Sequence, residues 1–451
     1  MPLIQELPSS PNDSLIEKCL RSLQLRTQDW NWFVSASDIR TESHLQEALE
    51  ILETQNSEIG DERRLQIIIA ISQYANENTP WSNTDLARKA LSVPRALVEP
   101  LLPRLFSYFQ DRLLKSSPKV TLDRNPRAAK NRGLRPILGH STPTSELDLK
   151  RKEWKESDNL YMIGSVCFWM HYDTSPESVA LIAAFTLNVM DDSDPAFRAQ
   201  GCFLIRKLIE NGFFMNIHKL GLVLLFKEEI RVCFNFLPRL TPGSISLGLM
   251  RAAYPTIVAI LDEEKEQKKE ANSRKYLSYL EILDLNILGL ISHIQSHAEE
   301  ASNSLIQYLL SFGTELIKSS IGAAVLACFS RLNATLCRLI TDPIVVDSDN
   351  GPLVVEAALN LQNTVLSEIL HAKPGASDLL LSYKYDFIAA WSVYQTRVLR
   401  YGVGTPESKE LVRSNFALLI ELARQNETTF QELEEDLRAI KEQNTELELC
   451  F

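Results

Sequence analysis

The stretch from residue 191 to residue 201 constrains the fold of this chain more than any other part of its sequence. It reads DDSDPAFRAQG and separates two apolar segments of helical periodicity, residues 178–190 and 197–209. Asp194 is placed to cap the second helix, because its carboxylate can accept free backbone N–H groups of the first turn. Pro195 follows at the first helical position, where a missing N–H costs nothing. The pattern predicts two helices joined by a short acidic turn.

The acidic residues of this turn allow a second interpretation, as a carboxylate cluster for metal binding or acid–base chemistry. They stand, however, where the orphan N–H groups of a helix start need acceptors. Arg198 is placed to pair with one of the aspartates across the turn, and Gly201 falls on the apolar face of the second helix. We therefore interpret the set as the structural signature of a stacked helical hairpin: Asp191, Asp192, Asp194, Pro195, Arg198 and Gly201.

Composition favours an all-α fold. Glycine is scarce, with 16 residues in 451, against an average usage of about 7%. From about residue 160 onward, helical segments of about 15–25 residues alternate with short turns that contain proline or glycine, as in paired-helix repeats of about 40 residues. The sequence therefore predicts a HEAT-like α-solenoid of stacked antiparallel helical hairpins.

Local signals place several helix ends. Ser82 and Asp85 have the spacing of a capping box, and two prolines should break a helix over 95–114. Continuous helices are expected over several later ranges, among them 176–190, 195–211, 215–237 and 377–400. The last expected helix, 429–446, is acidic and carries apolar residues on one face, as a terminal capping helix needs.

Residues 115–155 differ in character from the rest of the chain. They hold eleven basic and four acidic residues, a net charge of +7, and show no helical period. Connections longer than about 12–15 residues are usually functional or disordered. The sequence thus divides into an N-terminal helical region (1–114), a basic irregular linker (115–155) and a HEAT-like helical-repeat region (156–451).

Charge and apolar patterning limit the partners. The net charge is −11, so the chain as a whole is repelled by nucleic acid and by anionic membranes. No uninterrupted apolar run approaches the roughly 20 residues of a membrane span, and the first residues do not read as a signal peptide. The seven cysteines form no C-x-x-C pair and stand mostly in apolar helical contexts, which predicts free thiols in a reducing compartment, the cytoplasm or the nucleus.

Motifs for chemistry are missing. The sequence has no phosphate-binding loop, no G-x-S-x-G and no H-E-x-x-H. His293 and His297 have metal-ligand spacing, but they lie off the apolar face of their helix and have no third ligand near them in sequence. We therefore predict a protein without catalytic, cofactor-binding or metal-binding residues, and not an enzyme.

Two groups of aromatic residues are candidates for contacts. The group at Trp30, Trp32 and Phe33 suits an anchor between helices better than an exposed peptide-docking surface, because exposed tryptophan is costly. Trp154 stands in a basic stretch with Arg151 and Lys155, which is typical of an interface anchor. Docking of Trp154 on the chain's own helices remains an equal alternative.

The 191–208 stretch resembles the Tel-two-interacting protein two family. Members have an Asp-Asp pair, a proline and a small residue before a leucine-rich helix, here Asp191-Asp192, Pro195, Gly201-Cys202 and Leu204. The segments 234–240 and 249–261 are also similar, so the convincing part covers roughly residues 175–262. The Pro80-Trp81-Ser82 segment and the region from Arg135 to Lys155 resemble the family more weakly.

The resemblance implies a HEAT-like subunit of the TTT co-chaperone complex without an active site. It implies binding to Tel-two-interacting protein one and Tel-two, and work with the ninety-kilodalton heat-shock chaperone and its RuvB-like adaptor. The implied clients are phosphatidylinositol-3-kinase-related kinases of the TOR, ATM and ATR types. Two other functions stay open from the residues: an unrelated HEAT-repeat adaptor in transport or phosphatase regulation, and a nucleic-acid-binding module that uses 115–155. The last is disfavoured because no aromatic residue stands between the basic residues before Trp154.

Overall fold

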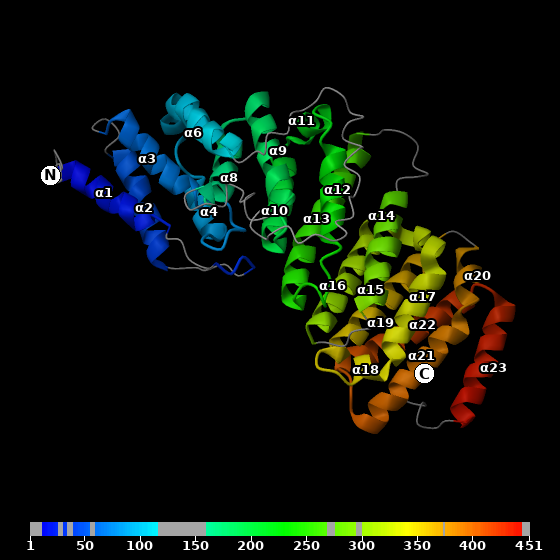
Figure 1. The fold of residues 1–451 in the computed structure, drawn as a ribbon. Coiled ribbons are helices and arrows are strands. Elements are labelled where there is room, and N and C mark those ends of the chain that lie inside the picture. Colours follow the sequence, from blue (N-terminus) through cyan, green and yellow to red (C-terminus); the bar gives the residue numbers. More distant parts are fainter. Residues whose placement is uncertain are drawn as a thin grey trace, which may run out of the picture. The chain divides into compact units, whose positions relative to one another are not determined.

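The structure is a computed structural model of the 451-residue chain. It describes residues 11–25, 30–33, 39–54, 59–115, 159–267, 276–294, 300–372 and 375–443. Within these ranges the regular elements are helices, with no strand, and successive helices pack as pairs (Figure 1). The predicted all-α fold of paired helices is confirmed.

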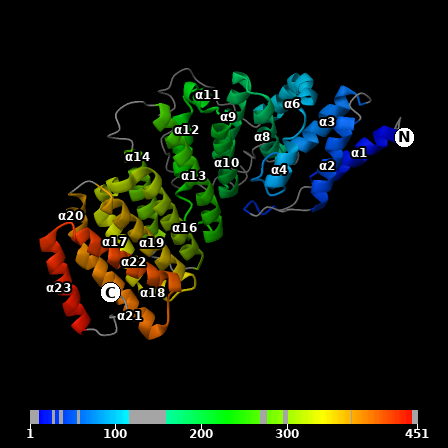
Figure 2. The same cartoon turned by 180° about the vertical axis from the view of Figure 1, so that it is seen from behind.

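The chain forms two compact units (Figure 1, Figure 2). The first unit comprises Met1–Arg231 and Ala252–Ile260, and the second comprises Val232–Arg251 and Leu261–Phe451. Helix α13 (Gly243–Gln267) therefore contributes residues to both units. Residues 116–155 of the predicted linker lie outside the described residues, and the division of the chain at 115 and 155 stays a prediction.

The first unit contains helices on both sides of the segment 116–158, and they pack against one another. These helices are α1 (Pro11–Leu23), α2 (Ile39–Thr54), α3 (Asp61–Ser72), α4 (Thr84–Ala90), α5 (Arg95–Val98), η1 (Glu99–Leu101), α6 (Leu102–Lys115), α8 (Met162–Tyr172), α9 (Pro176–Met190), α10 (Pro195–Glu210), α11 (Phe214–Lys219) and α12 (Val223–Cys233), the last two residues of which fall in the second unit.

The described part of the second unit continues with helices that include two π-helical segments and one 3₁₀ segment. They are α14 (Leu277–Glu281), η5 (Ile282–Leu288), α15 (Gly289–Ile294), α16 (Glu300–Leu316), η6 (Ile317–Ile321), η7 (Gly322–Cys328), α17 (Phe329–Thr341), α18 (Pro343–Val346), α19 (Gly351–Leu370), α20 (Ala376–Leu381), α21 (Lys384–Tyr401), α22 (Pro406–Ala423) and α23 (Glu427–Gln443).

Helices of the second unit stack at a regular sequence interval. α16, α19 and α22 pack side by side, while α17 packs against both α19 and α21 (Figure 1). Side-chain hydrogen bonds between neighbouring pairs join residues about one repeat apart: Asn303 and Ser348 at 45 positions, Lys384 and Glu432 at 48, Asn363 and Asn415 at 52. This interval exceeds the roughly 40 residues of the expected repeat, because the connections contain the short helices α18 and α20.

Several predicted helix ends are present, and others shift for local reasons. The break before α6 occurs at the 3₁₀ turn η1, which contains Pro100. The predicted capping box at Ser82 is wrong. Asn83 caps α4 by accepting from the Leu86 N–H, while the Ser82 hydroxyl donates to the Tyr74 carbonyl oxygen. The expected helix 215–237 is two helices, because the chain turns at Gly221 with φ +72°.

Within the part of the chain that the structure describes, three helices are long and apolar enough to cross a membrane by length and composition alone. They are Gly243–Lys265, Leu277–Ile294 and Ser302–Thr341, and between 44% and 56% of their apolar windows is buried inside the protein. Uninterrupted apolar runs did not indicate them, since isolated polar residues divide each helix into short runs. Ser302–Thr341 also contains Gly322 at φ +55°, where the helical path changes direction.

Candidate interaction surfaces

The acidic turn between α9 and α10 is built by hydrogen bonds from side chain to backbone. Asp194 is the N-cap of α10, and its carboxylate accepts the Ala196 N–H at 2.9 Å. Asp192 is buried and accepts the Asp194 N–H at 2.8 Å, which fixes the turn itself. Pro195 occupies the first turn of the helix. These residues thus determine how the chain enters α10.

Gly201 and Arg198 join α10 to its neighbours. A Cβ at Gly201 would lie 2.6 Å from the Met190 Cγ and Sδ atoms, so the glycine permits close packing of α9 on α10. The largely buried Arg198 guanidinium pairs with Glu229 of α12 at 3.3 Å. The sequence did not indicate Glu229, because it stands 31 residues away with no pattern linking the two.

An aromatic cluster joins the N-terminal residues to the rest of the first unit. The rings of Trp30 and Trp32 both meet Trp81 edge-on at 5.6 Å between centroids. Trp32 also contacts Phe197 of α10 at 4.7 Å, and Trp81 contacts Tyr161 at 5.2 Å. Trp81 is 3% exposed. The cluster is therefore an anchor between segments, as the sequence predicts for Trp30 and Trp32.

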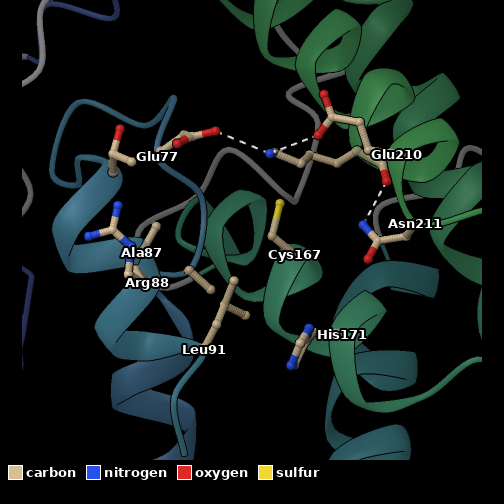
Figure 3. A pocket seen from close by; sticks show the side chains of 11 residues that line it. Glu77, Ala87, Arg88, Leu91, Cys167, His171, Glu210 and Asn211 are labelled. Atoms are coloured by element: carbon tan, nitrogen blue, oxygen red, sulfur yellow. Dashed lines mark hydrogen bonds and ion pairs between the residues drawn. The ribbon is translucent and has the colours of Figure 1, made fainter.

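A polar pocket of about 480 Å³ lies between α4, α8 and α10 (Figure 3). Lys207 of α10 spans part of it, with its Nζ atom 3.1 Å from Glu77 and 2.9 Å from Glu210. Burial alone would raise the pKa of Glu77, but the hydrogen bond and positive charge of Lys207 hold it below the ordinary value. The arrangement ties α10 to the loop before α4 and leaves the carboxylates neutralised.

The same pocket contains a thiol and an imidazole, Cys167 and His171 of α8 (Figure 3). Burial raises the pKa of the Cys167 thiol to about 12, so the thiol stays protonated at neutral pH and is a poor nucleophile. Burial lowers the pKa of His171, and the charge of Arg95 lowers it further. This pair has none of the electrostatic activation that a cysteine nucleophile requires.

The segment made of α11, the turn at Gly221 and α12 exposes several large apolar side chains. Met215, Leu220, Leu224 and Leu225 lie within eleven consecutive residues and are each between 46% and 62% exposed. The opposite side of α12 is buried through residues such as Phe226. Single exposed leucines are common on protein surfaces, whereas four large apolar side chains exposed within one short segment make it a candidate interaction site. We call these four residues the apolar hairpin surface.

Other sequence candidates fall in different places. Arg151, Trp154 and Lys155 lie outside the described residues, as does His297, while His293 is exposed. Among the described residues, no group of three or more His, Cys, Asp or Glu side chains is placed to hold a metal ion. The six cysteines within the described ranges are all free thiols, as predicted for them. The sequence analysis did not predict that the apolar hairpin surface is exposed, because it predicted one continuous helix over 215–237.

Comparison with known protein families matches residues 67–347 to the Tti2 family. The match covers more than half of the chain. The chain belongs to the Tti2 family. No solved structure matches it. The match extends beyond the 175–262 stretch that carries the sequence resemblance, and it includes the acidic turn and the apolar hairpin surface.

Membership of the Tti2 family defines the general function. The protein is a non-catalytic subunit of the TTT complex, which is involved in the stability of phosphatidylinositol-3-kinase-related kinases. The family also indicates a soluble intracellular protein.

Proposed function

We propose that this chain is the TTT subunit that binds Tel-two-interacting protein one directly. Through that contact it joins Tel-two, the ninety-kilodalton heat-shock chaperone and the RuvB-like adaptor. The clients are newly made kinases of the TOR, ATM and ATR types, in the cytoplasm and the nucleus. The observation that carries the proposal is the family match over residues 67–347. No membrane or nucleic-acid partner is part of it.

The apolar hairpin surface supplies a physical basis for binding a helical partner. Each exposed leucine that becomes buried on another protein contributes about 25 cal/mol per Å² of apolar surface. The exposed Lys219 and Glu228 stand in the same segment, the first among the four residues and the second after them, so the segment offers polar as well as apolar side chains to a partner. We infer that Leu224 and Leu225 face the partner's helices.

A second contact is proposed at Trp154, with Arg151 and Lys155 beside it. A tryptophan provides a large apolar anchor, and its basic neighbours add charge complementarity to an acidic helical partner. Replacement of Trp154 by alanine should weaken the complex, and replacement of both basic residues by glutamine should weaken it mainly at low salt. Pull-down at two salt concentrations separates the two effects.

The main test is co-expression with Tel-two-interacting protein one. Leu224→Glu should reduce co-purification about tenfold, because it places a charge in a desolvated contact. Leu379→Glu is the matched control, an exposed leucine on α20 of the second unit. Thermal melting of each variant alone checks that both stay folded.

The outcomes distinguish the function from the surface. Equal retention of both variants would remove the apolar hairpin surface from the interface and leave TTT membership intact. Failure of the unaltered chain to associate with Tel-two-interacting protein one would contradict the proposed direct contact. Affinity purification from cells that returns neither chaperones nor kinase clients would contradict the wider assignment.

A further inference from the structure

The last two helices of the second unit leave a groove between them. Its volume is about 290 Å³, and residues of α22 and α23 line it. Ile420 of α22 and three residues of α23, Phe430, Leu433 and Leu437, give the groove its apolar side chains. The buried Leu433 and Leu437 also belong to the α22–α23 interface. The apolar face that the sequence assigns to a terminal capping helix is therefore only partly covered within the described residues.

The place of the groove in the array suggests the shape of its occupant. α19 packs on both helices of the pair before it, α16 and α17, and α22 packs in the same way on α19 and α21. A further helix that continued this pattern would pack on α22 and α23, where the groove lies. Among the described residues no helix occupies that position. The groove is thus shaped by the repeat geometry to accept one more helix.

The charges at the groove suggest the chemistry of that helix. α23 is acidic overall, but two of its acidic groups face α21: Glu432 pairs with Lys384 at 3.3 Å, and Asp436 accepts a hydrogen bond from Tyr385 at 2.7 Å. The groove side instead presents Arg424, Arg438 and Lys441, and among the described residues that line it Glu434 is the one carboxylate.

Arg424 also lies over the Phe430 ring, at 5.4 Å from the centroid, so a cation and an aromatic ring stand together at one end of the groove. A protein with a net charge of −11 here carries a locally cationic, apolar surface. Such a surface favours an acidic partner by charge complementarity.

We propose that the α22–α23 groove binds an acidic amphipathic helix of a partner protein. The partner helix takes the position of the next helix in the array. Its apolar residues meet Phe430 and Leu437, and its carboxylates meet Arg424 and Arg438. This is the helix-in-groove mode of recognition. The inference does not depend on the proposed contact with Tel-two-interacting protein one.

A designed peptide tests the groove in the full chain. The probe is an amphipathic peptide of about 20 residues, alanine-rich so that it forms a helix, with leucines on one face and glutamates beside them. Its matched control has lysine in place of every glutamate. Fluorescence anisotropy should show micromolar binding of the acidic peptide that weakens as salt rises. Absence of binding, or equal binding of the lysine peptide, would overturn the proposal.

Charge reversal locates the binding. The double variant Arg424→Glu, Arg438→Glu should weaken binding of the acidic peptide at least about tenfold, or by about 1.4 kcal/mol. Arg413→Glu is the control, since Arg413 is an exposed residue of α22 outside the groove lining. Both variants alter exposed side chains, and circular dichroism checks that they fold. Equal binding by the double variant and the control would place the peptide elsewhere and refute the assignment.

A shortened chain that ends at Gln443 tests the competing occupant, the chain's own residues 444–451, which contain Glu446 and Glu448. Peptide affinity that stays within about twofold of the full chain supports a partner helix. A gain of tenfold or more on shortening would show that the chain's own segment fills the groove, and the proposal would fail.

Discussion

The interface of α3 with α8 and that of α19 with α22 hold helices together in two different ways. At the first, a Cβ on Gly164 would lie 1.9 Å from the Gln73 carbonyl oxygen, so the backbones approach too closely for a methyl group. At the second, the Asn363 side chain donates to Asn415 at 2.8 Å and bridges the gap. The size of the side chains at an interface therefore determines how closely two helices approach. The α3–α8 interface depends on the missing side chain of Gly164, and the α19–α22 interface depends on a hydrogen bond between two asparagines.

The two interfaces also differ in how far apart their residues stand in sequence. Ser72 and Ser165 hydrogen-bond at 2.8 Å across 93 positions, whereas Asn363 and Asn415 are 52 positions apart. The segment 116–158 stands between α6 and α8, and its 43 residues match the difference of 41 positions. Helix pairing in the first unit thus continues across a long insertion, because loop closure costs only about 0.6 kcal/mol for each doubling of loop length.

Gly164→Ala should give the largest effect. The new methyl group would overlap a backbone carbonyl, which cannot move as a side chain can, and we expect a loss of about 3 kcal/mol of unfolding free energy. Urea denaturation measures it. The control is Gly289→Ala, where the nearest atom is the Arg331 side chain at 3.5 Å and a neutral or stabilising result is expected. Equal effects at the two glycines would contradict close approach at the α3–α8 interface.

Asn415→Ala should cost about 2 kcal/mol, because it removes the two hydrogen bonds that the buried Asn415 side chain makes to α19, one to the Leu359 carbonyl and one from the Asn363 amide. The control is Asn360→Ala, which changes an exposed asparagine of α19 and should be neutral. The urea midpoint of both variants decides the point. Were Asn415→Ala harmless, the asparagine pair would not hold α19 and α22 together.

Asp194→Ala should cost about 1 kcal/mol through loss of the cap on α10. Asp194→Asn should retain most of that stability, since an asparagine oxygen can accept the same Ala196 N–H. Thermal melting of the two variants side by side tests this. A loss that is equal in both would indicate that the negative charge matters more than the hydrogen bond.

The smallest expected effect is the pH dependence at Glu77. The pKa of Glu77 is lower in the folded chain than its ordinary value, so its stabilising contribution is present above pH 4.5 and disappears as the pH falls through the folded pKa. Lys207→Met should flatten the dependence of the urea midpoint on pH as the pH falls below 4.5. Lys219→Met, an exposed lysine of α11, should leave it unchanged. An unaltered slope in Lys207→Met would exclude this ion pair as the cause.

Local signals predicted the α9–α10 hairpin closely. α9 spans Pro176–Met190 as expected, and Asp194 and Pro195 stand at the start of α10. Capping and periodicity decide such ends, and both act within a few residues. At Ser82 the same kind of signal failed, because its hydroxyl finds a tertiary partner in the Tyr74 carbonyl and leaves capping to Asn83.

The candidate surfaces were less predictable. Leu224 and Leu225 read as part of a dense apolar run, yet they are exposed, while Phe226 beside them is buried. A helix of such composition can turn any of several apolar sides inward, and only its neighbours decide which. The cationic side of α23 was hidden for the same reason, since the acidic residues of that helix outnumber the basic ones and the sequence does not show that Glu432 and Asp436 face α21.

The sequence by itself determined that this chain is helical, where the hairpin at the acidic turn begins and ends, and that its described cysteines are unpaired. It did so because hydrogen-bond caps, prolines and apolar periodicity act between residues close in the chain. The tertiary structure decided which helix faces stay exposed and at which positions no residue larger than glycine fits. It also decided that Arg198 pairs with Glu229. Those outcomes depend on contacts between residues many positions apart, which no local pattern encodes.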